Sequence, residues 1–243
     1  HYLEQRKRLD LAKRFVMGSM TQMRQVLRYY ANRRKENNQL FIDAIEKLDS
    51  LRKSVNETDS IAELMAFEGH ARENYYTCFD EIIKNKNFIF EKRTKRPPRN
   101  ALNALISFGN SICYTMVLSE IYKTYLDPRI GFLHTTNFRR FTLNLDVAEI
   151  FKPIMVDRLI FQLINKKIIT KSDFETEHTG GILLNDKGRR TFIEHMETRM
   201  RTTVNHRHLG RNVSYRRLIR LELYKIQKHV LGEKAYEPYA SLW

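Results

Sequence analysis

Two acidic residues three positions apart, Asp146 and Glu149, are the best candidates for chemistry in this sequence. This spacing places both carboxylates on one face of a helix. Their immediate neighbours are apolar, so we expect the pair to lie close to packed surface. Carboxylates in that position repel each other unless a proton or a cation intervenes. A divalent cation is one solution, and a salt bridge to Lys152 or Arg158 is the other, which the pattern alone favours.

Glu68 and His134 are the next two candidates, and each also has a structural interpretation. Glu68 lies in an apolar turn and is followed by Gly69. A glycine inside a helix costs about 1 kcal/mol relative to alanine, which suggests close approach by another backbone or by a ligand. An ion pair with Arg72, four residues further on, is the alternative for Glu68. His134 follows Gly-Phe-Leu in a predicted loop, where a packed, hydrogen-bonded imidazole is the default interpretation.

Helices must position these residues, because helix formers dominate and only nine glycines and five prolines interrupt the chain. Apolar residues recur at helical spacing from Leu9 to Ala31 and predict a long helix with a basic outer face. Pro153 is expected to kink or break the helix that carries the acidic pair. We predict a mainly α fold, with further helices over residues 38–51, from 59 or 60 past 79, 100–127, from 144, from 186 and 215–230, and with a polar loop over 53–59.

Residues 157–200 form a predicted winged-helix-like subregion within a helical domain that spans residues 1–243. The order of patterns is helix, apolar strand, glycine-containing turn, apolar strand and helix. This order predicts a small β-hairpin near residues 168–185.

The charge balance indicates a polyanionic partner. The chain has 43 Lys and Arg against 28 Asp and Glu, a formal net charge of +15. Nucleic acid is the first candidate and an anionic membrane surface the second. Cys78 and Cys113 form no CxxC pair, which fits a reducing cytoplasm. The apolar stretch from Ala101 to Tyr122 is broken by polar residues, so we expect a buried core helix rather than a membrane span.

Basic residues cluster where DNA phosphates can be contacted. The segment NKNFIFEKRTKRPPR, residues 85–99, contains two prolines and is predicted to be an exposed basic loop. Tyr75 and Tyr76 lie about two helical turns beyond Glu68, where an aromatic ring can stack on an unpaired base, and core packing is the equally weighted alternative. The predicted phosphate contacts are Arg93, Lys95, Arg96, Arg99, Arg139, Arg140 and Arg217.

Several blocks of the sequence, taken together, resemble one family. They read MAFEGHARENYY, RPPRNALNALISFGNSICYT, GFLHTTNFRRFTLNLDVAEIFKPIMVDRLIF and SYRRLIRLELYKIQKHVLGEKAYEPY. Their order and spacing are similar to those of the CRISPR-associated integrase-nucleases of spacer acquisition, the first of the numbered Cas proteins. The resemblance covers nearly the whole chain. The family's N-terminal strand-rich domain is not among the blocks, so the expected match is to the helical catalytic domain.

The resemblance implies a metal site held by Glu68, His134 and Glu149, with Asp146 as an auxiliary acid. Two carboxylates and an imidazole suit Mn²⁺ or Mg²⁺ better than a closed zinc site. Many family members have Arg where this chain has Lys152. A phosphate contact from that lysine would be a point charge rather than a bidentate fork.

The function implied by the resemblance is that of a metal-dependent DNA endonuclease and integrase in antiviral defence. A DNA 3′-hydroxyl would attack a phosphate at the repeat boundary of a CRISPR array and join a new spacer. The implied partners are double-stranded and branched DNA, a second copy in a homodimer of the full-length protein, and a small CRISPR-associated nuclease subunit that bridges two dimers. Two alternatives stay open: a transposon-type integrase or DNA-repair nuclease of the same fold, and a non-catalytic helical DNA-binding protein.

Overall fold

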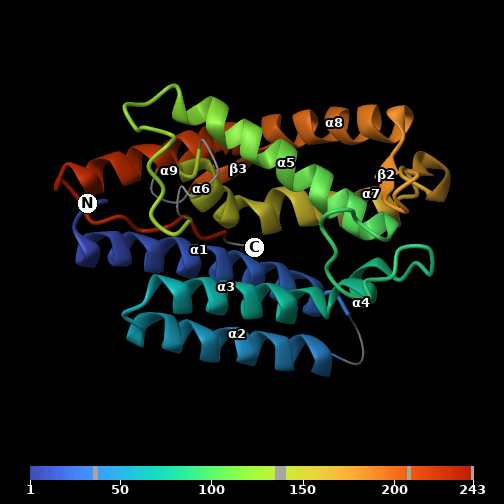
Figure 1. The fold of residues 1–243 in the computed structure, drawn as a ribbon, viewed down its shortest axis with the longest axis horizontal. Coiled ribbons are helices and arrows are strands. Elements are labelled where there is room, and N and C mark those ends of the chain that lie inside the picture. The colour runs from blue at the N-terminus through green and yellow to red at the C-terminus, as the bar shows by residue number, and fades with distance from the viewer. Residues whose placement is uncertain (35–37, 135–140, 207–208, 242–243) are drawn as a thin grey trace.

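Three long helices form one side of the molecule (Figure 1). The computed structural model describes residues 1–34, 38–134, 141–206 and 209–241. Helices α1 (Gln5–Ala31), α2 (Gln39–Glu57) and α3 (Ile61–Tyr76) pack against one another. The predicted first helix is confirmed. The predicted polar loop is wrong over residues 53–57, because α2 continues there and buries Val55 in its last turns.

A second group of helices packs on α1 and surrounds α6 (Leu143–Lys152). All ten residues of α6 are buried, so its two acidic residues lie inside the protein. Figure 1 shows α6 at the middle of the molecule, between α1 and α5. The mainly α prediction is confirmed. The other helices are α4 (Phe79–Ile83), α5 (Ala101–Ile121), α7 (Arg158–Asn165), α8 (Asp186–Arg201) and α9 (Tyr215–Val230).

A π-helical segment, Pro153–Asp157, joins α6 to α7 without a loop. Proline lacks a backbone N–H and disrupts the regular helical bonding of the preceding turn. The predicted break at Pro153 therefore takes the form of a widened turn rather than a sharp kink. Single π-helical turns inside α-helices are frequent at functional sites. This one ends at Asp157, which is 1% exposed.

Two short antiparallel pairs supply all the strands of the described residues. Strand β1 (Phe174–Thr176) pairs with β2 (Ile182–Leu184), which confirms the predicted hairpin, and its assignment to a winged-helix-like unit stays a prediction. Strand β3 (Thr203–His206) pairs with β4 (Arg211–Ser214). This second pair was not predicted, since four-residue strands carry too few apolar residues for an alternating pattern.

Helix α5 meets the length and composition expected of a membrane-spanning helix. It packs against α6, α9 and β2, and half of its most apolar stretch is buried within the protein. This packing agrees with the expected core helix.

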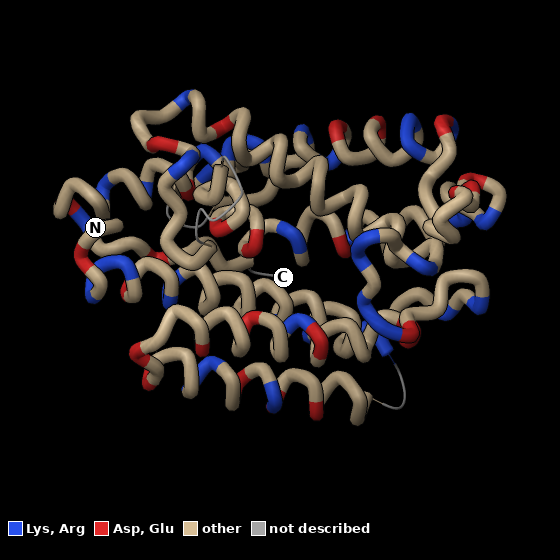
Figure 2. Tube along the Cα trace, in the orientation of Figure 1, with Lys and Arg blue, Asp and Glu red and all other residues tan. Residues whose placement is uncertain are grey.

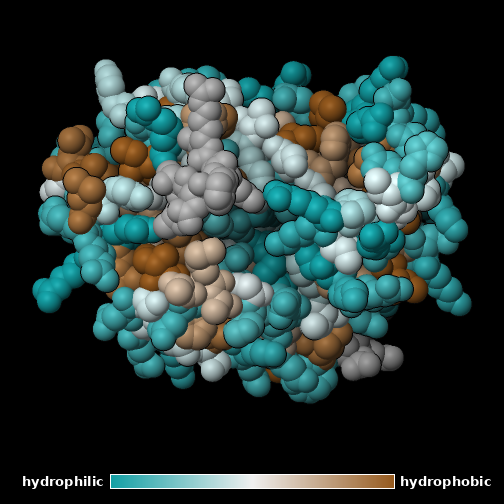
Figure 3. Space-filling view, viewed as in Figure 1, coloured by the Kyte–Doolittle hydropathy of each residue, from teal (hydrophilic) through white to brown (hydrophobic). Residues whose placement is uncertain are grey.

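In the view of Figure 2, Lys and Arg are spread over many elements of the molecule. Figure 2 shows acidic and basic positions together on α3 and α6 near the middle of the view. Figure 3 shows a hydrophilic hollow in the same central region. Charged groups of opposite sign therefore meet at the centre of this face, where the predicted site residues lie.

Candidate active site

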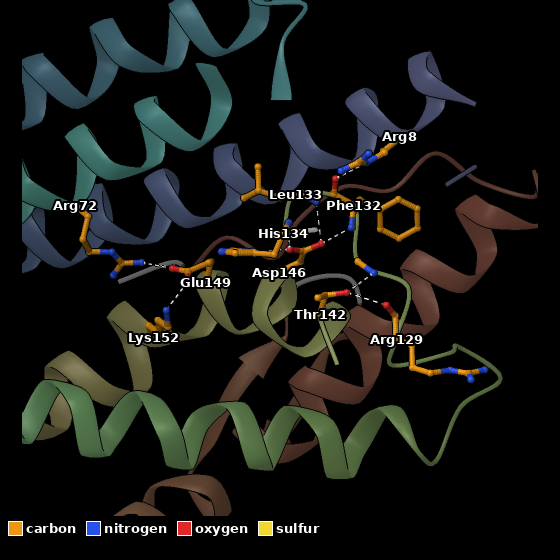
Figure 4. Close-up of polar contacts among 11 residues, drawn as sticks. Arg8, Arg72, Arg129, Phe132, Leu133, His134, Thr142, Asp146, Glu149 and Lys152 are labelled. Atoms are coloured by element: carbon orange, nitrogen blue, oxygen red, sulfur yellow. Dashed lines mark hydrogen bonds and ion pairs between the residues drawn. The ribbon is translucent and has the colours of Figure 1, made fainter. Parts of the chain in front are cut away.

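The carboxylate of Asp146 holds the loop that carries His134 (Figure 4). Its Oδ2 accepts hydrogen bonds from the backbone N–H groups of Phe132 (2.6 Å) and Leu133 (3.0 Å). Its Oδ1 accepts one from the backbone N–H of His134 (3.0 Å) and lies 2.7 Å from His134 Nδ1. Asp146 is fully buried. One carboxylate therefore positions both the backbone of this loop and the imidazole ring.

Residues 131–134, called the histidine loop below, have three further anchors. The N–H of Gly131 donates to Thr142 Oγ1 (2.9 Å), and Thr142 Oγ1 donates to the carbonyl of Arg129 (2.8 Å). Arg8 of α1 donates from Nε to the carbonyl of Phe132 (2.9 Å). A Cβ at Gly131 would lie 2.7 Å from Thr142 Oγ1, so only glycine allows this approach.

The carboxylate of Glu149 is paired with two cations (Figure 4). Arg72 Nη2 lies 2.5 Å from Glu149 Oε2, and Lys152 Nζ bonds to Oε1. Burial alone would raise the pKa of Glu149, but the charges of Lys152 and Arg72 outweigh it and lower the pKa to about 2. The salt-bridge alternative for this acid is therefore present in the structure.

Lys152 is buried, and this corrects its assignment as a phosphate contact. Its side chain is 7% exposed, and Nζ lies 4.7 Å from the centre of the Tyr114 ring in addition to its bond with Glu149. A lysine held between a carboxylate and an aromatic ring presents no free charge to a phosphate.

Glu68 lies on α3, on the same face as Arg72. Arg72 Nε is 3.5 Å from Glu68 Oε1, so the intrahelical ion pair is also present. Burial and the nearby charge of Glu149 raise the pKa of Glu68, and Arg72 offsets part of this rise. Among the described residues, no atom lies within 4 Å of the position that a Cβ at Gly69 would take. The part of the chain that the structure describes therefore does not show the expected close approach of another backbone at Gly69.

Arg72 connects three acids, of which Glu149 and Asp157 are buried and Glu68 is partly exposed, and sequence reasoning did not predict this arrangement. In addition to Glu68 and Glu149 it faces Asp157, with Nη1 3.8 Å from Oδ2. Burial raises the pKa of Asp157 to about 6, and the charge of Arg72 offsets only part of that effect. The available signal was a single acid in the apolar run PIMVDRLIF.

The side chains of Glu68, His134 and Glu149 fit a hard divalent cation by donor type. Because Nδ1 of His134 faces Asp146, Nε2 is the ring nitrogen left for a metal, an arrangement common among histidine ligands. Within the described ranges, however, no three His, Cys, Asp or Glu side chains converge as a metal-binding group. Arg72 and Lys152 hold both oxygens of Glu149. A metal ion bound by Glu149 would therefore share these oxygens with the two cations or displace one of them.

The predicted basic loop is divided between structural and exposed residues. Arg93 donates to Asn103 Oδ1 (2.9 Å) and Ser107 Oγ (2.9 Å), and so attaches the loop to α5. Its assignment as a phosphate contact stays a prediction. Arg99 is exposed and donates to two carbonyls of the β1–β2 turn, at 3.2 and 3.4 Å. Lys95 and Arg96 are exposed and stay candidates for phosphate contact.

The remaining candidates for DNA contact have different outcomes. Arg217 on α9 is exposed, and Arg139 and Arg140 lie outside the described residues. Tyr75 and Tyr76 are buried, and both rings pack against Phe79. The proposed base stacking is corrected to core packing, because neither ring has a face exposed to solvent.

The fold and the site together define a mainly helical domain in which acidic residues and a histidine meet, partly exposed, near its centre. The model of the CRISPR associated protein Cas1 family matches residues 1–198. The chain belongs to this family.

Named relatives and solved structures agree with this assignment. The chain is 54% identical, over its whole length and 72% of the relative, to CRISPR-associated endonuclease Cas1 2 of Thermodesulfovibrio yellowstonii. It is 46% identical, over 97% of its length and 70% of the relative, to CRISPR-associated endonuclease Cas1 of Thermotoga maritima. A solved structure of a Thermotoga maritima Cas1 protein superposes with a TM-score of 0.86 at 45% identity, covering 96% of this chain and 69% of the other.

A more distant solved structure shares the fold alone. It is described as a casposase bound to integration product and superposes with a TM-score of 0.82 at 20% identity, covering 98% of this chain and 68% of the other.

Proposed function

We propose that this chain is the catalytic domain of a metal-dependent DNA endonuclease and integrase that joins new spacer DNA into a CRISPR array. The observation that carries the proposal is the position of His134. Asp146 binds both the backbone and the ring of His134, and the charges of Glu68 and Glu149 lie near that ring. Membership of the Cas1 family, with relatives named as endonucleases, supports the same activity.

Glu68, His134 and Glu149 are proposed to hold one Mn²⁺ or Mg²⁺ ion. When bound, such an ion neutralises charge on the phosphate in the transition state and activates the attacking oxygen. Asp146 keeps the proton of His134 on Nδ1 and thereby presents Nε2 as a donor. Arg72 and Lys152 balance the charge of Glu149 while that carboxylate has no metal.

Double-stranded and branched DNA are the proposed substrates. The net charge of +15 and the exposed side chains of Lys95, Arg96 and Arg217 support this assignment. Family membership supports a homodimer of the full-length protein and a small CRISPR-associated subunit that bridges two dimers. The cytoplasm is the proposed location.

The alternative of an integrase outside CRISPR immunity keeps the same site. The likeness to the casposase structure shows that this fold is shared. Identity of 54% over the whole chain to a named Cas1 endonuclease favours the CRISPR function. A non-catalytic DNA-binding protein would leave the relation to named endonucleases unexplained.

An assay of cleavage and strand joining on linear and branched DNA tests the proposal. Wild type is compared with His134→Ala in Mn²⁺, in Mg²⁺ and with a chelator. We expect products that require a divalent cation and that disappear in the variant, while DNA affinity is retained. Activity that survives the chelator or the substitution would overturn the metal-site assignment.

A further inference from the structure

Residues 236–241, called the strap below, run without helix or strand between α1 and α9 (Figure 1). They lie outside residues 1–198, which the family model matches. On the α9 side, Glu222 Oε1 accepts hydrogen bonds from the Tyr236 hydroxyl (2.6 Å) and the Tyr239 N–H (2.9 Å). Glu222 is buried, and burial of a charged acceptor is stabilised by such charge-assisted bonds.

The strap is held equally firmly on the α1 side. Gln22 is fully buried, donates from Nε2 to the Tyr239 carbonyl (2.6 Å), and accepts from the Ser241 hydroxyl (2.7 Å). Arg14 Nη1 donates to the Tyr236 carbonyl (2.5 Å). Side chains of α1 and α9 thus make hydrogen bonds to backbone groups of the strap, which has no helix or strand of its own to pair them.

One path of contacts leads from the strap to the histidine loop. The centre of the Tyr236 ring lies 5.6 Å from the centre of the Phe15 ring on α1, and the Phe15 ring centre lies 6.3 Å from that of Phe132. All three rings are buried. The backbone N–H of Phe132 donates to Asp146, which positions His134. Tyr236 therefore supports the loop through two packed aromatic contacts.

A second path leads from the strap to the helix that carries Glu149. A Cβ at Gly18 would lie 2.7 Å from Pro238 Cβ and 3.1 Å from Ile150 Cγ1. The absence of a side chain at Gly18 lets the strap, α1 and α6 approach closely. Ile150 directly follows Glu149 in α6. Gly18 of α1 is therefore the one residue between Pro238 and the helix that carries Glu149.

We propose that the strap is the rear support of the active site, with Tyr236 and Pro238 as positioning residues. Tyr236 sets the histidine loop through Phe15, and Pro238 limits movement of α6 at Ile150. Only the description of the loop and helix as catalytic rests on the proposed function. The mechanical coupling itself is a property of the fold and can be measured without DNA or metal.

Hydrogen exchange of the backbone N–H groups of residues 132–134 tests the coupling, because Asp146 protects these groups. Tyr236→Leu removes the ring contacts, whereas Tyr236→Phe retains them. We expect about tenfold faster exchange in Tyr236→Leu, from more frequent local opening, and a smaller increase in Tyr236→Phe, which keeps the ring contacts and loses only the hydrogen bond to Glu222. Phe192→Leu is the matched control, since it removes an equally buried ring that packs on α5 at Phe108.

Gly18→Ala is the second variant, and it keeps the test open if Tyr236→Leu does not fold. Its new Cβ meets Pro238 and should displace the strap, so the same N–H groups should exchange faster. Binding of Mn²⁺, followed by the spin-resonance signal of the free ion, should weaken in every variant that speeds exchange. Unchanged exchange in the strap variants, or equal acceleration in Phe192→Leu, would overturn the proposal. Inactive wild-type protein with the expected exchange would overturn only the proposed function.

Discussion

His134 and Asp146 are joined twice, once through the backbone and once through the ring. Asp146 Oδ1 lies 3.0 Å from the backbone nitrogen of His134 and 2.7 Å from its Nδ1. Burial would lower the pKa of His134, but the hydrogen bond and charge of Asp146 outweigh it and raise the pKa. The carboxylate thereby fixes both the ring position and the nitrogen that carries the proton.

Asp146→Asn should impair catalysis without removing any proposed metal ligand. The amide has only one oxygen acceptor for three backbone N–H groups and the imidazole. Activity should fall about 10- to 100-fold, as for other residues that orient metal ligands. Single-turnover cleavage and joining measure this loss. Asp127→Asn is the control, since Asp127 pairs locally with Arg129. Equal activity of Asp146→Asn and wild type would contradict the positioning role.

Arg72→Met should strongly destabilise the fold. Arg72 faces Glu68, Glu149 and Asp157, and its side chain is 12% exposed. Removing the cation of a buried ion pair costs about 3–5 kcal/mol, because the acids lose their counter-charge. Urea unfolding measures the change.

The control for that measurement is Arg24→Met. Arg24 pairs with Asp49 at 2.9 Å, and their side chains are 26% and 36% exposed. An ion pair with this exposure contributes about 1 kcal/mol or less. Similar losses for the two variants would contradict a central role of Arg72 in the buried cluster.

Asp157→Asn should change the pH dependence of stability. The pKa of this acid is about 6 in the folded protein against an ordinary 3.8. A raised folded-state pKa gives stability that is fully present below pH 3.8 and lost as the pH rises through 6. Asparagine resembles the protonated acid, so the variant should unfold at a higher urea concentration than wild type at pH 7. Its free energy of unfolding should exceed that of wild type by up to about 3 kcal/mol. The two proteins should converge near pH 4, and a gap that is constant with pH would contradict this account.

Lys152 and Arg96 should differ in their effect on DNA binding. Arg96 is exposed, whereas Lys152 is buried against Glu149. The logarithm of the DNA association constant should fall linearly with the logarithm of salt concentration, because phosphate contacts release counterions. Arg96→Gln should reduce that slope by about 1, and Lys152→Met should leave the slope unchanged. A reduced slope for Lys152→Met would restore that residue as a phosphate contact.

Local patterns predicted the elements that carry a continuous apolar stripe. Helix α9 spans Tyr215–Val230, the range that its apolar stripe predicted, and Ser214 is its N-cap. The side chain of Ser60 caps α3, and residue 60 is one of the two predicted starts of this helix. In both cases the residues that decide the boundary lie next to it in the sequence. The predicted continuation of α3 past residue 79 is wrong, because α3 ends at Tyr76 and α4 begins at Phe79.

Long-range contacts explain what the sequence analysis missed. Arg72 was considered only as a partner of Glu68, because its contacts with Glu149 and Asp157 depend on how α3 packs against the α6 region. Arg93 looks like a free basic residue until α5 places Asn103 beside it. Tyr76 lies on the same predicted helix as Glu68, yet Phe79 and Phe90 cover its ring.

Replacing Glu149 tests the central claim most directly. Glu149→Ala and Glu120→Ala are matched, because Glu120 is also buried between two cations, Lys123 and Arg220, each at 2.7 Å. Both variants are checked by thermal unfolding and then assayed with Mn²⁺ for DNA affinity, cleavage and strand joining. We predict that Glu149→Ala binds DNA and performs no chemistry, while Glu120→Ala retains both. Cleavage and joining by folded Glu149→Ala at the wild-type rate would contradict the account.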